Sequence, residues 1–78
     1  MVIEVRLYAT LRRYAPPDSA GMRSVDIPEG CTAGELLGII GVDPEEVHLL
    51  MVNGVNAAAE QVLWDGDRVG LFPVVGGG

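Results

Sequence analysis

Alternating apolar residues near both ends of the chain constrain the fold more than any other feature. Ile3, Val5 and Leu7 alternate with charged residues, and residues 68–72 show a similar alternation. A period of two is typical of β-strands that bury one face. A small sheet must bury its most apolar strands, so we expect the first and last strands to be neighbours in the middle of the sheet.

One segment between these strands has a clear helical pattern. Thr32 and Glu35 have the spacing of a capping box, in which each side chain bonds the backbone amide of the other residue. Gly41 follows as a plausible residue for the end of the helix. The apolar face that we expect to pack inward consists of Leu36, Leu37, Ile39 and Ile40.

Short turns and strands account for the remaining elements. Asn53-Gly54 is a strong hairpin signal, and Asp65-Gly66-Asp67 is a second tight turn. The pattern predicts strands at 23–27 and 48–52, a short return strand from Val55, and single helical turns at 9–14 and 43–46. Strand patterns on both sides of one helix predict an α+β fold, with a mixed sheet of about five strands and the helix on one face.

Length and charge limit the class of protein. With 78 residues, the chain is expected to form a single domain, residues 1–78, with a tail at 73–78. It has eleven acids, five arginines and no lysine, and its net charge of −6 argues against binding to nucleic acid. No segment has the pattern of a membrane span or a secretory signal, so we expect a cytoplasmic protein.

Isolated residues give no catalytic or metal site. Cys31 has no cysteine partner and precedes the predicted helix, where a thiol pKa is lowered, but no histidine is near it in the sequence. His48 is alone, whereas a metal site needs several ligands. The two carboxylates of residues 65–67 are too few ligands for a calcium site. We therefore expect no metal site.

The sequence ends on Gly76-Gly77-Gly78, directly after the last predicted strand and Pro73. Two interpretations are open from these residues. Chain ends are usually frayed, so the glycines can be an inert terminus. Alternatively, a segment without side chains can enter a narrow site in a partner and present the carboxylate of Gly78 there.

Several segments together resemble the MoaD/ThiS family of ubiquitin-like sulfur carriers. The resemblance covers nearly the whole chain, and the order and spacing of its segments make it specific. It is carried by Val5 to Arg12, Thr32 to Leu37, Val52 to Val55, Asp65 to Val69 and Leu71 to Pro73, followed by the glycines. The resemblance implies a β-grasp fold with a flexible C-terminal Gly-Gly tail.

The resemblance also implies a function. Gly77 and Gly78 occupy the positions of the family's functional pair. An E1-like enzyme would use ATP to adenylate the carboxylate of Gly78, and a sulfur donor would convert it to a thiocarboxylate. The chain itself would bind no cofactor and would act as a carrier or small subunit, with the catalytic groups on its partners.

The start of the chain and the Phe72-Pro73 step are most similar to the small subunit of molybdopterin synthase, which implies that enzyme's large subunit as a partner. The ending Val75-Gly76-Gly77-Gly78 is as similar to the thiamine carrier, since the molybdopterin type often has proline at 74 and a non-glycine at 76. Two further functions stay open at this point: a ubiquitin-like modifier conjugated through Gly78, and an inert interaction domain.

The expected partner-binding residues precede the glycine pair. Alternation places Leu71 in the core and Phe72 on the opposite face, where its ring can anchor a partner. Arginines at 6, 12 and 68 can pair with acids of a partner or form a solvated face. The expected partner-binding set is Phe72, Pro73, Val74, Val75 and Gly76.

Overall fold

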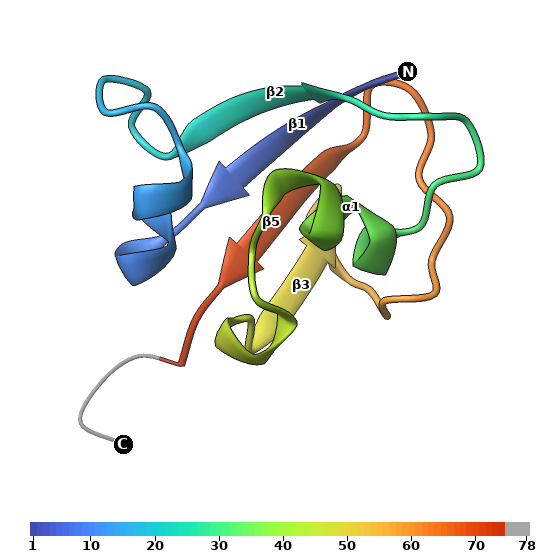
Figure 1. The fold of residues 1–78 in the computed structure, drawn as a ribbon. Coiled ribbons are helices and arrows are strands. Elements are labelled where there is room, and N and C mark those ends of the chain that lie inside the picture. The colour runs from blue at the N-terminus through green and yellow to red at the C-terminus, as the bar shows by residue number, and fades with distance from the viewer. Residues whose placement is uncertain (75–78) are drawn as a thin grey trace.

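The computed structural model describes residues 1–74 and has the predicted α+β architecture (Figure 1). Five strands form one mixed sheet in the order β2-β1-β5-β3-β4. The elements in chain order are β1 (Val2–Leu7), the 3₁₀ helix η1 (Ala9–Tyr14), β2 (Met22–Asp26), α1 (Ala33–Ile40), the 3₁₀ helix η2 (Pro44–Glu46), β3 (Leu49–Val52), β4 (Val55–Asn56) and β5 (Arg68–Phe72).

The first and last strands form the centre of the sheet, as the alternation predicted. β1 and β5 run parallel, with Val5 opposite Val69 and Leu7 opposite Leu71. β2 pairs with β1, and β3 pairs with β5, both antiparallel. The parallel pair places Phe72 at the opposite end of the sheet from Val2, where the C-terminal segment leaves the fold.

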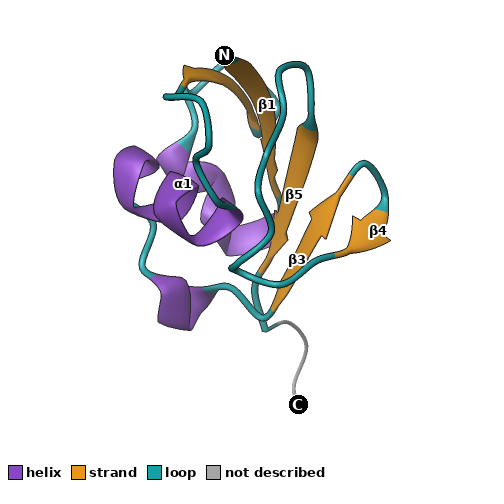
Figure 2. Ribbon diagram, turned by 90° about the vertical axis from the view of Figure 1, so that its right-hand side faces the viewer, coloured by secondary structure: helices purple, strands orange, loops and turns teal. Residues whose placement is uncertain are grey.

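The core lies between α1 and one face of the sheet (Figure 2). Alternate residues of the strands point toward the helix, and no helix of residues 1–74 covers the opposite face of the sheet, which we call the uncovered face (Figure 2). Leu36 is fully buried, and Leu37 and Ile40 are nearly so. The strand residues of the core are Ile3, Val5, Leu7, Val25, Leu50, Val52, Val69 and Leu71.

Local sequence signals set the ends of α1. The Thr32 side chain accepts a hydrogen bond from the Glu35 amide at 3.2 Å, and the Thr32 amide donates to Glu35 Oε1 at 3.1 Å. This is the predicted capping box. Gly41 ends the helix with a positive φ of 77°. The prediction that Ile39 packs inward was wrong: its side chain is 48% exposed, because Ala33, Leu36, Leu37 and Ile40 occupy the face toward the sheet.

The turns follow their predicted types, with small shifts at strand boundaries. Asn53 and Gly54 have φ of 52° and 82°, as a tight hairpin between β3 and β4 requires. β2 begins at Met22 and ends at Asp26, one residue earlier than predicted at each end. β3 begins at Leu49, although the His48 amide still donates to the Phe72 carbonyl at 2.7 Å.

Gly21 marks a close approach between the loop after η1 and the end of β1. Its φ is +82°, and its carbonyl accepts a hydrogen bond from the Leu7 amide at 2.7 Å. A Cβ at this position would overlap the carbonyl oxygen of Leu7. No side chain can be added there unless the backbone moves.

We expect Gly21→Ala to lower the free energy of unfolding by about 3 kcal/mol or more, because it adds a backbone overlap to the cost of a left-handed φ. Urea denaturation measures this. Gly30→Ala is the matched control, since Gly30 also has φ +82° but a Cβ there would meet nothing within 4 Å. The free energy of unfolding of this control should fall by about 1–2 kcal/mol. Equal losses in the two variants would contradict the close approach at Gly21.

Candidate partner-docking site

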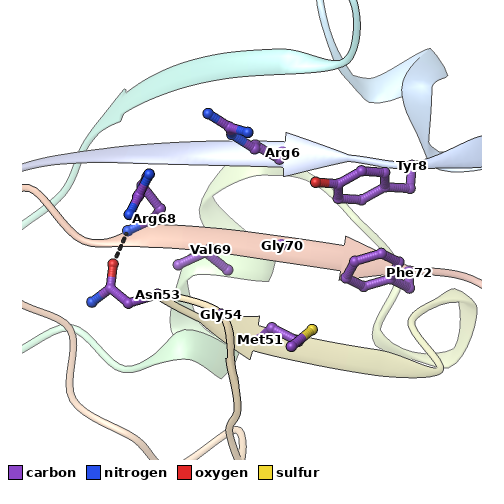
Figure 3. Close-up of a pocket in the computed structure, with 9 residues that line it drawn as sticks. All are labelled: Arg6, Tyr8, Met51, Asn53, Gly54, Arg68, Val69, Gly70 and Phe72. Atoms are coloured by element: carbon purple, nitrogen blue, oxygen red, sulfur yellow. Dashed lines mark hydrogen bonds between the residues drawn. The ribbon is translucent and has the colours of Figure 1, made fainter.

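The uncovered face of the sheet carries a shallow hollow of about 260 Å³ across the central strands (Figure 3). Its lining residues come from β1 and the residue that follows it, from β5, from β3 and from the turn that follows β3. We call it the sheet-face hollow. It is lined by Arg6, Tyr8, Met51, Asn53, Gly54, Arg68, Val69, Gly70 and Phe72.

A stacked aromatic pair forms one end of the hollow. The rings of Tyr8 and Phe72 are parallel within 5°, with centroids 4.3 Å apart. The Tyr8 amide donates to the carbonyl of Leu71 at 3.2 Å, which holds the end of β1 beside the end of β5. Phe72 is half-buried whereas Leu71 is fully buried. The prediction that these two residues lie on opposite faces is therefore confirmed.

Gly70 forms the floor beside this pair. A Cβ on Gly70 would lie 3.3 Å from Cε2 of Phe72 and 3.7 Å from Cε2 of Tyr8. The first distance is closer than ordinary van der Waals contact, so a side chain would fill the floor and press on the Phe72 ring. The depth of the hollow at this position therefore depends on the absence of a side chain at Gly70.

Two arginines lie on the same face, with Arg68 at the other end and Arg6 beside Gly70 on the neighbouring strand (Figure 3). Arg6 Nε bonds Glu4 Oε2 at 3.0 Å, and this hydrogen bond, together with the charge of Glu4, raises the pKa of Arg6. The Arg68 amide donates to Asn53 Oδ1 at 3.0 Å (Figure 3). Asn53 Nδ2 in turn donates to Asp67 Oδ1 at 3.0 Å. Within residues 1–74, the guanidinium of Arg68 makes no hydrogen bond or ion pair.

The sequence-predicted site residues are placed as follows. Phe72 lies in the hollow, Pro73 is buried, and Val74 is 68% exposed. Val75, Gly76, Gly77 and Gly78 lie outside the described residues. Sequence reasoning missed Tyr8, Met51 and Gly70. Alternation along β1 could have placed Tyr8 on the face of Arg6, but the stack on Phe72 depends on the pairing register.

A reactive thiol at Cys31, which the sequence did not favour, is contradicted by the structure. The side chain is buried, 4% exposed, and burial together with the nearby charge of Glu35 raises the pKa of the thiol. His48 is exposed. In the part of the chain that the structure describes, no group of three or more His, Cys, Asp or Glu side chains is placed to hold a metal ion.

A polar cluster joins the two 3₁₀ helices. Glu46 in η2 accepts hydrogen bonds from Arg13 and from the hydroxyl of Tyr14, both in η1. Both hydrogen bonds lower the pKa of Glu46, and the bond from Tyr14 has the larger effect. The same bond raises the pKa of the Tyr14 hydroxyl. Arg13 also lies 4.6 Å from the centre of the Tyr14 ring. The cluster ties together two segments that are more than thirty residues apart in sequence.

The chain is similar to known proteins over nearly its full length. A family model described as Mut7-C ubiquitin matches residues 1–76. SAMP1, the small archaeal modifier protein 1 of Haloferax volcanii, is 26% identical, with a TM-score of 0.77 and all of both chains covered. No curated protein matches the chain.

Two further solved structures carry molybdopterin-related names. A Pyrococcus furiosus chain assigned as molybdopterin converting factor, subunit 1, is 26% identical, with a TM-score of 0.73 over 95% of this chain and 98% of that one. Subunit 1 and subunit 2 of the Helicobacter pylori factor were solved as a complex; the match is 23% identical with a TM-score of 0.64 over all of both chains, which shows the fold alone. These likenesses confirm the predicted ubiquitin-like fold of the MoaD/ThiS type. No helix within residues 1–74 is long and apolar enough to cross a membrane.

We expect Glu46→Gln to reduce the acid dependence of stability. A lowered pKa in the folded state stabilises the protein above the ordinary glutamate pKa of about 4.3, and this contribution is lost as pH falls through the folded value. The variant should therefore lose stability mainly near neutral pH and approach the parent near pH 3. Thermal unfolding between pH 3 and pH 7 measures this. Glu45→Gln is the control, since its side chain makes no hydrogen bond or ion pair to residues 1–74. A parallel shift at every pH for Glu46→Gln would contradict the assignment.

Proposed function

The chain belongs to the Mut7-C ubiquitin family, and on that premise we propose that it is a sulfur carrier that works through the carboxylate of Gly78. One observation carries the proposal: a MoaD-type fold covers the chain, and its central strand β5 leads directly into the segment that contains Gly77 and Gly78. Glycine at both positions removes the steric barrier to enzymes that must reach the same carbonyl.

The chemistry begins with activation. A carboxylate is a poor electrophile until one of its oxygens becomes a leaving group. In the proposed reaction an E1-like enzyme transfers AMP from ATP to the Gly78 carboxylate and releases pyrophosphate. A sulfur donor then displaces AMP and leaves a thiocarboxylate. Its negative charge lies partly on a soft, nucleophilic sulfur, which a partner enzyme transfers to the acceptor.

The sheet-face hollow supplies recognition in this proposal. Phe72 ends the strand that leads toward the glycines, so a partner bound at Phe72 also has the C-terminal segment within reach. Positioning of this kind lowers the entropic cost of the transfer. The chain contributes delivery, and its partners contribute the catalytic groups. This division fits a carrier or small subunit in the cytoplasm rather than a stand-alone enzyme.

We assign the acceptor pathway to molybdopterin synthesis, with the large subunit of molybdopterin synthase as the docking partner. The likeness to the Pyrococcus furiosus chain supports this choice, and the Helicobacter pylori complex shows that a chain of this fold binds a second subunit in that system. The thiamine pathway is the alternative within the same chemistry.

A second candidate function is protein modification. The likeness to SAMP1, a modifier by name, supports it. The same activated Gly78 would then form an amide with a lysine of another protein. Because this chain has no lysine, it could not build chains of itself through lysine side chains. Conjugates would therefore carry one copy per modified lysine.

We expect the purified chain, incubated with ATP, its E1-like enzyme and a sulfide source, to gain the mass that matches replacement of one oxygen by sulfur. Intact-mass spectrometry detects the change, and fragmentation should place it on Gly78. The same measurement establishes that the chain ends at Gly78. A variant without Gly77-Gly78 should stay unmodified and keep its melting temperature, because these residues carry no side chain for the core.

Each other outcome has a defined meaning. An unchanged mass in the full reaction contradicts the carrier function. A thioester or amide to other proteins, seen as larger species on a denaturing gel, favours the modifier. A large loss of melting temperature in the shortened variant would contradict the claim that Gly77 and Gly78 are outside the core.

We expect Phe72→Ala to weaken binding to the large subunit of molybdopterin synthase more than it weakens folding. The half-buried ring contributes about 0.5–1.5 kcal/mol to folding through its stack on Tyr8, whereas a central aromatic anchor contributes about 2 kcal/mol or more to an interface. Calorimetric titration and urea denaturation give the two values. Trp64→Ala is the control, since Trp64 is 71% exposed and lies outside the hollow. A greater effect on folding than on binding would identify Phe72 as a core residue.

A further inference from the structure

The lining of the sheet-face hollow contains arginine but no acidic residue, although the chain as a whole is acidic. The chain has a net charge of −6 and only five arginines, and two of these five, Arg6 and Arg68, line the hollow. Glu4, beside the hollow, bonds Nε of Arg6 and lies opposite Arg68 in the register of β1 and β5. The guanidinium of Arg68 is therefore the cationic group of the hollow that has no hydrogen bond or ion pair within residues 1–74.

The positive charge is available to a partner. Arg68 is exposed and its guanidinium has no hydrogen bond or ion pair to any described residue. Arg6 bonds Glu4 through Nε, and the Tyr8 hydroxyl also acts on its guanidinium. Guanidinium groups bind carboxylates with two parallel hydrogen bonds, so Arg68 is the side chain that retains its donors for an incoming acid.

The two ends of the hollow differ in chemistry. Figure 3 shows the Tyr8 and Phe72 rings at one end, Arg68 at the other, and Gly70 and Met51 between them. An apolar side chain fits against the rings and over Gly70, where the absence of a Cβ leaves room. A carboxylate on the same bound peptide segment would then lie near the guanidinium of Arg68.

We propose that the sheet-face hollow recognises a protein segment that carries an acidic residue next to an apolar side chain. The recognition of this segment stands independently of sulfur transfer; only the identity of the partner that bears it rests on the proposed function. The carboxylate contributes mainly specificity and association rate, since Arg68 is exposed to solvent. The apolar side chain contributes the affinity, by covering the Tyr8–Phe72 stack.

The test is selection of random linear peptides displayed on phage against the full-length chain. We expect the selected peptides to be enriched in Asp or Glu next to Leu, Phe or Met. Arg68→Glu should weaken the binding of these peptides about tenfold, which is 1.4 kcal/mol, and should shift a new selection toward Lys and Arg. Gly70→Ala should weaken them by filling the floor. Arg12→Glu makes the same charge change at an exposed residue outside the hollow and should leave binding unchanged.

Three results would overturn the proposal. The first two are a selection that yields no peptides above an unrelated control protein, and a selection whose peptides show no preference for acidic residues. The third is peptide binding that stays intact in Arg68→Glu and Gly70→Ala, when circular dichroism shows that both variants have a native fold. The selection contains no activating enzyme, ATP or sulfide. Peptide recognition without a thiocarboxylate would refute only the carrier function, and a thiocarboxylate without peptide recognition would refute only this inference.

Discussion

The parallel pairing of β1 with β5 is the interaction on which the rest of the structure depends. These strands come from opposite ends of the chain, and their pairing closes nearly the whole sequence into one loop. Such closure costs entropy, which the burial of Val5, Leu7, Val69 and Leu71 against the helix side offsets. β2 attaches to this pair on one side and β3 on the other, and β4 extends the sheet beyond β3.

The same pairing builds both faces of the sheet. Because side chains alternate along a strand, the register that buries Leu7 beside Leu71 also places Arg6 beside Gly70 on the uncovered face. Tyr8 then lies within stacking distance of Phe72. A shift of one residue would exchange the two faces and expose the core. The hollow is thus a direct consequence of the register that gives the protein its core, and Gly70 is the position where the two strands leave space on that face.

The sequence predicted what local chemistry controls. The capping box at Thr32, the hairpin at Asn53-Gly54 and the alternation along β1 are each complete within a few residues, so the structure confirms them. The prediction that Ile39 packs inward was wrong, because the whole fold sets which face of the helix packs on the sheet. The extent to which Cys31 is buried, which raises the pKa of its thiol, is likewise set by the whole fold and has no local signal. The Tyr8–Phe72 stack and the Arg13–Tyr14–Glu46 cluster join residues far apart in sequence, so no sequence window contains them.

The composition of the chain's end has a consequence for specificity. Gly76, Gly77 and Gly78 offer a partner only backbone and, in the proposed function, a carboxylate. A sulfur carrier and a protein modifier can therefore share the same ending and the same activation chemistry. What distinguishes their partners must lie in side chains, and upstream of the exposed Val74 the sheet-face hollow offers a set of such side chains. The guanidinium of Arg68, which is unpaired within residues 1–74, and the aromatic stack together form, in the proposed recognition, a surface that discriminates between partners by charge as well as by shape.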